Sequence, residues 1–343
     1  MKHLIRNCAL ALALIFSLPA SAWAQDAAHP APSAQHRDAS HQDTPRAKSE
    51  RGGSVLDLLP ADAVSDHTLN IDGRKLAYTA TAGTLNLYDQ SGQRSAAVFY
   101  TSYVAKDQND KQGLDRPITF VFNGGPGAAS AFLNLGLVGP RRLDFGPTER
   151  DGAHATLVDN PQTWLAFTDL VLIDPIGTGW SRTAKADDAK NFYGVRQDAQ
   201  AIAKTIALYL SHQSRTGSPT YLLGESYGGF RAAKVASALS DEQGIVVSGI
   251  VMLSPLLDGA LTFGGNRLAL GAALQLPSLA AAELERRNAF SLKDQQTAER
   301  FALTDYLTTL AGPAPSGPTA DTFYQRVADI TGLPLDVIRK RRG

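Results

Sequence analysis

One serine lies in a sequence that could make it a nucleophile. Residues 220–229 read Thr-Tyr-Leu-Leu-Gly-Glu-Ser-Tyr-Gly-Gly. A short apolar β run, Tyr221–Leu223, leads into Gly224-Glu225-Ser226-Tyr227-Gly228, a Gly-x-Ser-x-Gly pattern in which a sharp strand-to-helix turn lifts the serine above a sheet. The glycines two residues before and after the serine relieve crowding in that strained turn. The pattern predicts Ser226 as a nucleophile for acyl transfer; an ordinary serine in a glycine-rich turn is the alternative.

The histidine that would activate Ser226 is not found in its usual place. Along chains with this turn the order is Ser, then Asp or Glu, then His. The seven histidines all precede Ser226: His3, His29, His36, His41, His67, His154 and His212. His212 fits better as the end of a helix, and His154 as part of a solvated loop. The triad Asp and His are therefore unknown, and we expect the 343-residue chain by itself to be inactive or nearly so.

A second loop could bind the charge that develops during acyl transfer. Asn123-Gly124-Gly125-Pro126-Gly127 directly follows an apolar strand pattern, Ile118–Phe122. Acyl transfer needs two backbone N–H donors aimed at the oxyanion. One donor follows the nucleophile and the other comes from a glycine-rich loop after an earlier strand. Gly125 and Tyr227 are the candidates for this oxyanion hole. A plain Gly-Pro turn is the alternative, and a phosphate loop is disfavoured because no Gly-Lys-Ser/Thr follows.

A third loop completes a family pattern. Residues 174–181 read Asp-Pro-Ile-Gly-Thr-Gly-Trp-Ser and follow another apolar strand pattern. In this order, the three loops resemble those of the serine carboxypeptidase family, of the carboxypeptidase Y type, and the resemblance spans about residues 95–258. It implies an α/β-hydrolase fold with N-terminal antiparallel edge strands, parallel core strands and a partial helical cap.

The resemblance also implies roles for individual residues. Ser226 would be the catalytic nucleophile, and the backbone N–H groups of Gly125 and Tyr227 would form the oxyanion hole. The C-terminal carboxylate of the substrate would be bound by Asn123, Gly124 and Glu225. Because two like charges in contact cannot both stay ionised, Glu225 must be protonated to hold that carboxylate, so binding should favour acidic pH. A surface carboxylate that merely follows the strand is the alternative for Glu225.

The activity implied is removal of C-terminal residues from peptides through a serine acyl-enzyme. Neither a metal nor an organic cofactor is called for. An esterase or acyltransferase on the same fold is one alternative. A non-catalytic exported homologue that binds peptide C-termini is another.

The elements that must position these loops change character along the chain. Antiparallel strands are predicted at Leu69–Ile71, Arg74–Tyr78, Gly83–Tyr88 and Ala96–Val104, with a hairpin turn at Asp72-Gly73. Core strands are predicted at Ile118–Phe122, Leu170–Ile173, Tyr221–Leu223 and Ile245–Leu253. Two helices alternate with these strands, one with an apolar stripe at Phe192, Val195, Ala199, Ile202, Ile206 and Tyr209, and one over Tyr227–Leu239. Strands that alternate with helices predict a buried parallel sheet.

The rest of the sequence predicts helices. They cover Leu268–Leu276, Ala280–Arg287, Leu292–Leu310 and Thr322–Ile330, with loops at Pro277, Pro313, Pro315 and Pro318 between them. We interpret residues 55–263 as an incomplete hydrolase core and residues 264–343 as a helical cap that is cut short.

The N-terminus predicts export. Residues 1–24 combine Lys2 and Arg6, the apolar stretch Ala9–Leu18, and an Ala-Trp-Ala cleavage site that ends at Ala24. We therefore expect a periplasmic or extracellular protein with no stable membrane anchor after cleavage. The only cysteine, Cys8, lies in this signal, so no disulfide is expected. Residues 25–54, rich in Ala, Pro, Asp, His and Ser, are predicted to be a disordered linker.

The overall composition limits the partners. Hydrophobic residues make up 43% of the chain and charged residues 19%, which is enough apolar sequence for a large core. Lys plus Arg equals Asp plus Glu, at 33 each. Broad binding to nucleic acid needs a basic face, so nucleic acid is not an expected partner. The peptide partner is what the family resemblance implies.

Overall fold

The computed structural model describes residues 54–343 except 72, 107–115, 147–151 and 264–267. The predicted signal peptide (1–24) and the predicted linker (25–54, apart from Ser54) therefore lie outside the described residues. Within the described ranges, no helix has both the length and the apolar character needed to cross a membrane.

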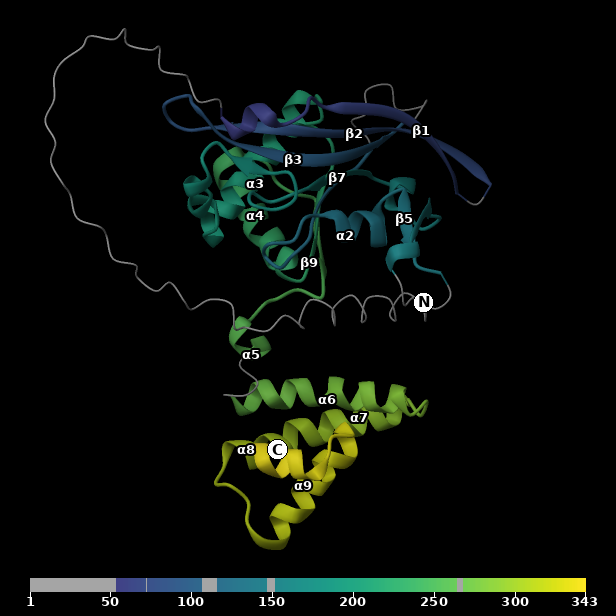
Figure 1. The fold of residues 1–343 in the computed structure, drawn as a ribbon, viewed down its shortest axis with the longest axis vertical. Coiled ribbons are helices and arrows are strands. Elements are labelled where there is room, and N and C mark those ends of the chain that lie inside the picture. Colours follow the sequence, from purple (N-terminus) through teal and green to yellow (C-terminus); the bar gives the residue numbers. More distant parts are fainter. Residues whose placement is uncertain (1–53, 72, 107–115, 147–151, 264–267) are drawn as a thin grey trace, which may run out of the picture. The chain divides into compact units, whose positions relative to one another are not determined.

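A mixed sheet organises the residues from Ala63 to Leu253 (Figure 1). Its strands are β1 (Ala63–Ile71), β2 (Arg74–Tyr88), β3 (Arg94–Ala105), β4 (Ile118–Phe122), β7 (Asp169–Ile173), β8 (Arg182–Thr183), β9 (Thr220–Glu225) and β10 (Gly249–Leu253). They are ordered β1-β2-β3-β7-β4-β9-β10, and β8 pairs with β3. β1, β2 and β3 are antiparallel, whereas β7, β4, β9 and β10 run parallel to one another. The predicted antiparallel edge and parallel core are confirmed.

Two strand predictions need correction. The strands predicted at Arg74–Tyr78 and Gly83–Tyr88 are one continuous strand, because the residues between them stay paired with β3 in unbroken register. The strand predicted from Ile245 begins only at Gly249. The Ile245 N–H donates to Leu239 O at 3.0 Å, so Ile245 completes the C-terminal cap of the preceding helix and does not enter the sheet.

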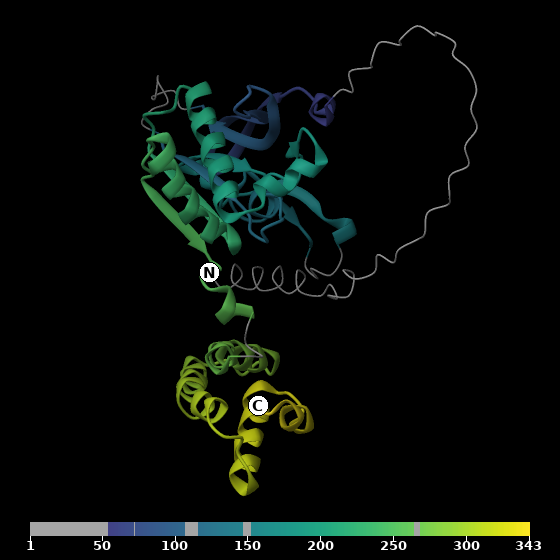
Figure 2. The same ribbon diagram turned by 90° about the vertical axis from the view of Figure 1, so that its left-hand side faces the viewer.

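Two long helices cover one face of the sheet. α3 (Val195–His212) and α4 (Tyr227–Gln243) pack against each other and run side by side next to the strands (Figure 2). The predicted apolar stripe is buried at Ala199, Ile202, Ile206 and Tyr209. At its start the prediction fails, since Phe192 belongs to the 3-10 helix η5 (Ala186–Phe192) and Val195 is exposed.

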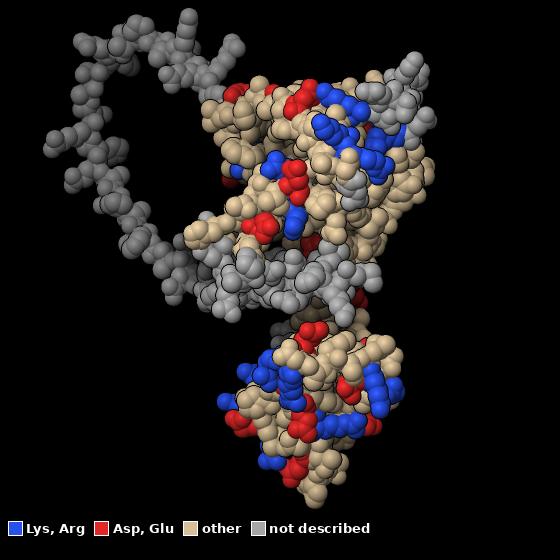
Figure 3. Space-filling model, turned by 90° about the vertical axis from the view of Figure 1, so that its right-hand side faces the viewer, with Lys and Arg blue, Asp and Glu red and all other residues tan. Residues whose placement is uncertain are grey.

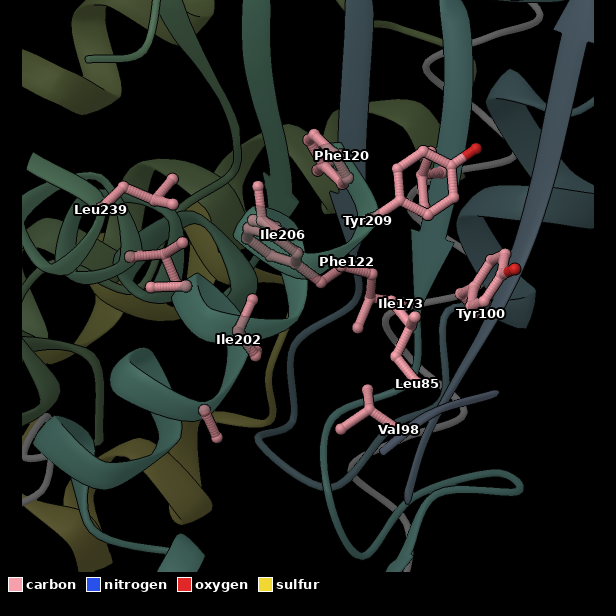
Figure 4. Close-up of a cluster of buried hydrophobic side chains, with 14 of the residues drawn as sticks. Leu85, Val98, Tyr100, Phe120, Phe122, Ile173, Ile202, Ile206, Tyr209 and Leu239 are labelled. Carbon is pink, nitrogen blue, oxygen red and sulfur yellow. The ribbon is translucent and has the colours of Figure 1, made fainter. Parts of the chain in front are cut away.

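The core between these helices and the sheet holds the strand ends in place (Figure 4). The Tyr209 ring of α3 makes edge-to-face contacts with Phe120 at 5.7 Å and with Tyr100 at 5.3 Å between ring centroids. Side chains alternate along β4, so Phe120 and Phe122 enter this core while Val121 enters a second cluster on the other face. β4 is buried on both faces, as is usual for a central parallel strand.

Short elements connect β4 to β7. They are α2 (Ala131–Leu133), the π-helical turn η2 (Asn134–Val138), β5 (Arg141–Asp144), the 3-10 turn η3 (Gly152–His154), β6 (Thr156–Asp159) and the 3-10 turn η4 (Trp164–Ala166). β5 and β6 pair in a separate two-stranded sheet. Neither strand was predicted, because each has four residues and carries no clear alternation of apolar and polar side chains.

The described residues after Asp258 are helical, as predicted. The helices are α5 (Gly259–Phe263), α6 (Ala269–Arg286), α7 (Leu292–Phe301), the π-helical turn η6 (Ala302–Tyr306), α8 (Leu307–Ala311), α9 (Gly317–Thr331) and α10 (Leu335–Arg341). α6 to α10 share a buried cluster of their own, which includes Leu276, Phe301 and Tyr324. The extent of a cap domain over residues 264–343 stays a prediction.

Prolines explain most of the errors among these helices. Pro277 does not separate two helices but lies inside α6, where it removes one backbone hydrogen bond. Leu276 and Ala280 on either side of it are buried, and this packing keeps the helix continuous. Pro318 lies in the first turn of α9, where the missing N–H costs little. α10 was not predicted.

Candidate active site

Three loops follow three neighbouring strands at one edge of the sheet. The loop Asn123–Gly127 follows β4, the loop Asp174–Ser181 follows β7, and Ser226 follows β9. Since β7, β4 and β9 are adjacent and parallel, their carboxyl ends meet at the same edge, the usual place for a site in such a sheet. The sequence elements that carry the resemblance are therefore neighbours in space.

Ser226 occupies a strained turn between β9 and α4. Its backbone angles are φ 59° and ψ −123°, a conformation that residues other than glycine rarely adopt. The Ser226 N–H donates to Leu253 O at 2.9 Å, and Ser226 O accepts from Leu256 N–H at 3.0 Å. These bonds fix the turn to the segment that ends β10. The predicted sharp strand-to-helix turn is present.

The glycines around the turn allow close approach. A Cβ atom on Gly224 would lie 1.9 Å from Gly228 O, and one on Gly228 would lie 2.4 Å from Phe122 O. Neither position leaves space for a side chain. The turn is thus packed directly against the end of β4.

The two candidate oxyanion donors lie on segments in contact. A Cβ atom on Gly124 would lie 2.7 Å from Tyr227 N, so the glycine-rich loop touches the start of α4. Tyr227 is the first residue of that helix, and an N–H there has no acceptor within the helix. Gly125 has φ +105°, a conformation that favours glycine. Among the described residues, neither N–H has a hydrogen-bond acceptor.

Asn123 and Glu225 are brought together beside the serine. Asn123 is 4% exposed, and its Nδ2 donates to Glu225 Oε2 at 3.3 Å. Asn123 Oδ1 accepts from Leu133 N–H at 3.0 Å, which fixes the orientation of the amide because only its oxygen can accept. Among the described residues, Glu225 is the one acceptor for Nδ2. Glu225 itself is half-buried.

Asp174 joins the third loop to Ser130, the residue that precedes α2. It is 7% exposed, and its Oδ1 accepts from the Ser130 N–H at 2.8 Å. Burial raises the pKa of Asp174, while backbone N–H donors from Ser130 and Trp180 oppose the rise. A Cβ atom on Gly179 would lie 1.8 Å from Asp174 Oδ2, so the carboxyl group fills the turn of its own loop.

Two further residues of the site were missed from the sequence. Arg231, in the second turn of α4, donates from Nε to Asp198 Oδ2 on α3 at 2.7 Å. It also donates to the Asn123 and Pro126 carbonyls, at 2.7 and 3.0 Å. A signal was available, since Arg231 is the one charged residue in an otherwise apolar stretch, Phe230–Ala233.

The described histidines are His67, His154 and His212. His67 lies on β1, which is five strands from β9 and therefore about 24 Å away. His212 ends α3, as predicted, near the amino end of β9, and Ser226 follows the carboxyl end about 20 Å further on. His154 is exposed in the turn before β6. The triad base remains unassigned.

The described residues contain no group of three or more His, Cys, Asp or Glu side chains that could hold a metal ion. On the face shown in Figure 3, charges of both signs are interspersed, with one gathering of Lys and Arg near the top of the view. The predictions about cofactors and nucleic acid are not tested by these observations.

The mixed sheet, the strained serine turn and the glycine-rich loop after β4 together define an α/β-hydrolase. A family model described as serine carboxypeptidase matches residues 75–264, which is more than half of the chain. The chain belongs to the serine carboxypeptidase family.

Individual relatives are more distant. The retinoid-inducible serine carboxypeptidase of Homo sapiens is 29% identical over 150 residues, which cover 43% of this chain and 30% of that protein. Serine carboxypeptidase-like 44 of Arabidopsis thaliana is 26% identical over 216 residues, or 60% of this chain and 41% of that protein. The chain thus spans less than half the length of these relatives.

Among solved structures, the prohormone-processing carboxypeptidase Kex1 of Saccharomyces cerevisiae matches with a TM-score of 0.44 and 20% identity. The match covers 74% of this chain and 53% of that one.

Proposed function

We propose that this site binds the C-terminal carboxylate of a peptide and that Ser226 attacks the carbonyl of the last peptide bond, as in a serine-type carboxypeptidase. One observation carries the proposal: a carboxyl group and a buried amide N–H donor lie directly beside a strained serine. Asn123 Nδ2 donates to Glu225 Oε2 at 3.3 Å, and Glu225 immediately precedes Ser226.

The chemistry follows from this arrangement. Ser226 Oγ forms a bond to the scissile carbonyl carbon, and the oxyanion is bound by the Gly125 and Tyr227 N–H groups. The C–N bond then breaks, the C-terminal amino acid leaves, and water releases the acyl group from Ser226. The serine proton needs a general base, a role that we assign to no residue described here.

The carboxylate site can be tested apart from turnover. An N-blocked dipeptide with a free C-terminal carboxylate and its C-terminal amide should differ in affinity by about 10- to 100-fold, since a charge-assisted hydrogen bond contributes roughly 1.5–3 kcal/mol. Calorimetric titration of both ligands at mildly acidic pH measures this difference. The preference for the acid should survive Ser226→Ala and weaken in Asn123→Ala. Equal affinity for acid and amide would refute the carboxylate site.

Peptide binding without turnover is a second candidate. The observation in its favour is that the described histidines His67 and His212 lie on parts of the fold remote from Ser226. Incubation of the chain with a fluorophosphonate, which labels an activated serine covalently, separates the two. Labelling that disappears in Ser226→Ala supports catalysis, whereas carboxylate binding without any labelling supports a binding protein.

We also propose that the protein is exported. The signal pattern at residues 1–24 supports this, because its positive start, apolar stretch and Ala-Trp-Ala end follow the order of a cleavable signal. N-terminal sequencing of the protein expressed in a bacterial host should give Gln25 as the first residue of the processed form. An intact Met1 in the mature protein would contradict export by this route.

A further inference from the structure

A buried arginine joins the helix after the serine to the glycine-rich loop. Arg231 is 2% exposed, and a charge so buried is costly unless it is paired and hydrogen-bonded. Each of its three guanidinium nitrogens donates to one acceptor, and the acceptors lie on two different segments. Nε donates to Asp198 Oδ2 at 2.7 Å, Nη1 donates to Asn123 O at 2.7 Å, and Nη2 donates to Pro126 O at 3.0 Å.

The two backbone acceptors bracket the glycines of the loop. Asn123 O belongs to the peptide unit that carries the Gly124 N–H, and Pro126 O belongs to the unit that carries the Gly127 N–H. Two peptide units lie between them, and the first of these is also held, because Gly124 O accepts from Ala128 N–H at 3.1 Å. The same peptide unit carries the Gly125 N–H. In a planar trans peptide this N–H points in the opposite direction to Gly124 O. Fixing these carbonyls therefore fixes the direction of the Gly125 donor.

Asp198 holds the guanidinium in place. It lies in the first turn of α3, its side chain is 13% exposed, and it accepts from Nε, the one guanidinium nitrogen that does not bind the loop. The fork of donors on arginine is rigid and planar, so fixing Nε also aims the other two nitrogens. The Tyr227 ring, 5.1 Å from Arg231 Cζ, covers the guanidinium from the start of α4.

We propose that Arg231, oriented by Asp198, is a positioning residue that keeps the Asn123–Gly127 loop in register with the Ser226 turn. Arg231 touches neither substrate nor oxyanion, and it acts through the peptide carbonyls of the loop. Its importance for substrate rests on the function proposed above, whereas its effect on the loop does not. Lysine cannot replace it, because one ammonium cannot reach a carboxylate and two divergent carbonyls with the same geometry.

The alternative is that this pair only stabilises the fold. The chain contains a matched control at the other end of the strands. Arg215 is 7% exposed and donates to Asp169 Oδ2, to Arg116 O and to Ser218 Oγ, each at 2.7 Å. It therefore has the same kind of burial and pairing but no contact with the glycine-rich loop.

Hydrogen exchange of the full chain separates the two roles. In Arg231→Lys, we expect the Ala128 amide, which donates to Gly124 O across the loop, to exchange about tenfold faster than in the wild type, because charge-assisted bonds worth roughly 1.4 kcal/mol or more no longer hold the loop. The amides in the middle of β9 report global opening and serve as the internal reference. In Arg215→Lys, loop exchange should change only as much as β9 exchange does. Equal loop acceleration in both variants, or none in Arg231→Lys, would overturn the proposal.

Asp198→Asn provides a second variant should Arg231→Lys fail to fold. It keeps both carbonyl bonds and loosens only Nε, so loop exchange should rise by about threefold relative to β9. Loop exchange that follows β9 in this variant would also count against the positioning role.

Binding of the N-blocked dipeptide acid supplies the functional readout. Its affinity should fall about tenfold in Arg231→Lys and stay within about twofold in Arg215→Lys. If the wild type does not prefer the acid over the amide, the proposed function fails while the exchange experiment still decides the role of Arg231.

Discussion

The two ends of the parallel strands each contain a buried arginine–aspartate pair, and the pairs are used differently. At the amino ends, Arg215 and Asp169 join the segments that enter β4, β7 and β9. At the carboxyl ends, Arg231 and Asp198 join α3 and α4 to the loop that leaves β4. At the amino end, a guanidinium with three acceptors joins the segments that lead into the strands. At the other end, a second such guanidinium holds a loop whose Gly125 N–H has no acceptor among the described residues.

The difference lies in what remains unpaired. Asp169 is 1% exposed and accepts from Arg116, Arg215 and the Ala105 N–H, so both oxygens of this buried carboxylate are hydrogen-bonded. The carboxyl end combines a strained Ser226 with free backbone donors. An enzyme site of this kind needs a rigid frame around groups that are left ready for substrate. Variants at the two ends can show whether the amino end supplies stability and the carboxyl end supplies the site.

The largest expected effect is at the amino end. Asp169→Ala leaves Arg215 buried without its carboxylate, which should lower the free energy of unfolding by about 3–5 kcal/mol. Urea denaturation followed by tryptophan fluorescence measures the loss. A loss below about 1 kcal/mol would show that the Arg215–Asp169 pair contributes little to stability. The idea that the amino end is the stabilising end of the sheet would then be wrong.

At the carboxyl end, a single methyl group should disturb the site. In Gly124→Ala the new Cβ would lie 2.6 Å from Glu225 O and 2.7 Å from Tyr227 N, so the loop and the turn must separate. We expect a loss of about 1–3 kcal/mol in stability together with loss of dipeptide-acid binding.

Gly127→Ala is the matched control in the same loop. A Cβ atom there meets nothing within 4 Å. Stability should change by no more than about 0.5 kcal/mol and binding should persist. If both alanine variants behave alike, the close contact between the loop and the turn is not what maintains the site.

The strain at Ser226 should be measurable as lost stability. Its φ of 59° and ψ of −123° are easily adopted only by glycine. Relief of that strain in Ser226→Gly, less the entropy cost of glycine, should raise the free energy of unfolding by about 0.5–1 kcal/mol. The measurement is again urea denaturation, with Ser237→Gly in the middle of α4 as an exposed control that should be destabilising. Destabilisation in both variants would mean that the serine turn is unstrained.

Much of the carboxyl end could be predicted from sequence because its signals are local. Two apolar runs each predict a strand and the loop after it. They are Ile118–Phe122, which glycines follow closely, and Tyr221–Leu223, which leads into the Gly-x-Ser-x-Gly motif. Both strands and both loops lie where the sequence places them. The error at Pro277 has the opposite cause, since the local rule for proline gives way to packing around Leu276 and Ala280.

The two arginine pairs could not be predicted, because their partners are far apart in the chain. Asp198 and Arg231 are separated by 33 positions, and Arg231 and Asn123 by 108. The apolar stretch Phe230–Ala233 singles out Arg231 as an isolated charge, but nothing in the sequence indicates which residues on other segments it contacts. Only the folded arrangement shows that Arg231 serves the loop of another strand.

The smallest expected effect is a change in how the free energy of unfolding depends on pH. It tests whether burial or the attraction of Arg231 has the larger influence on the pKa of Asp198. Burial raises the pKa of Asp198 above its ordinary value of 3.8, by more than Arg231 lowers it. The folded chain then holds this proton more tightly than the unfolded chain, so stability is lost as the pH rises from 3.8 through the pKa of the folded state. Asp198→Asn cannot titrate and lacks this loss. The free energy of unfolding of the wild type minus that of Asp198→Asn, measured by urea denaturation from pH 3 to 7, should therefore become lower as the pH rises and then level off. If instead the wild type gains on the variant as the pH rises, the attraction of Arg231 outweighs burial, and the carboxyl-end pair is a net stabiliser of the ionised fold.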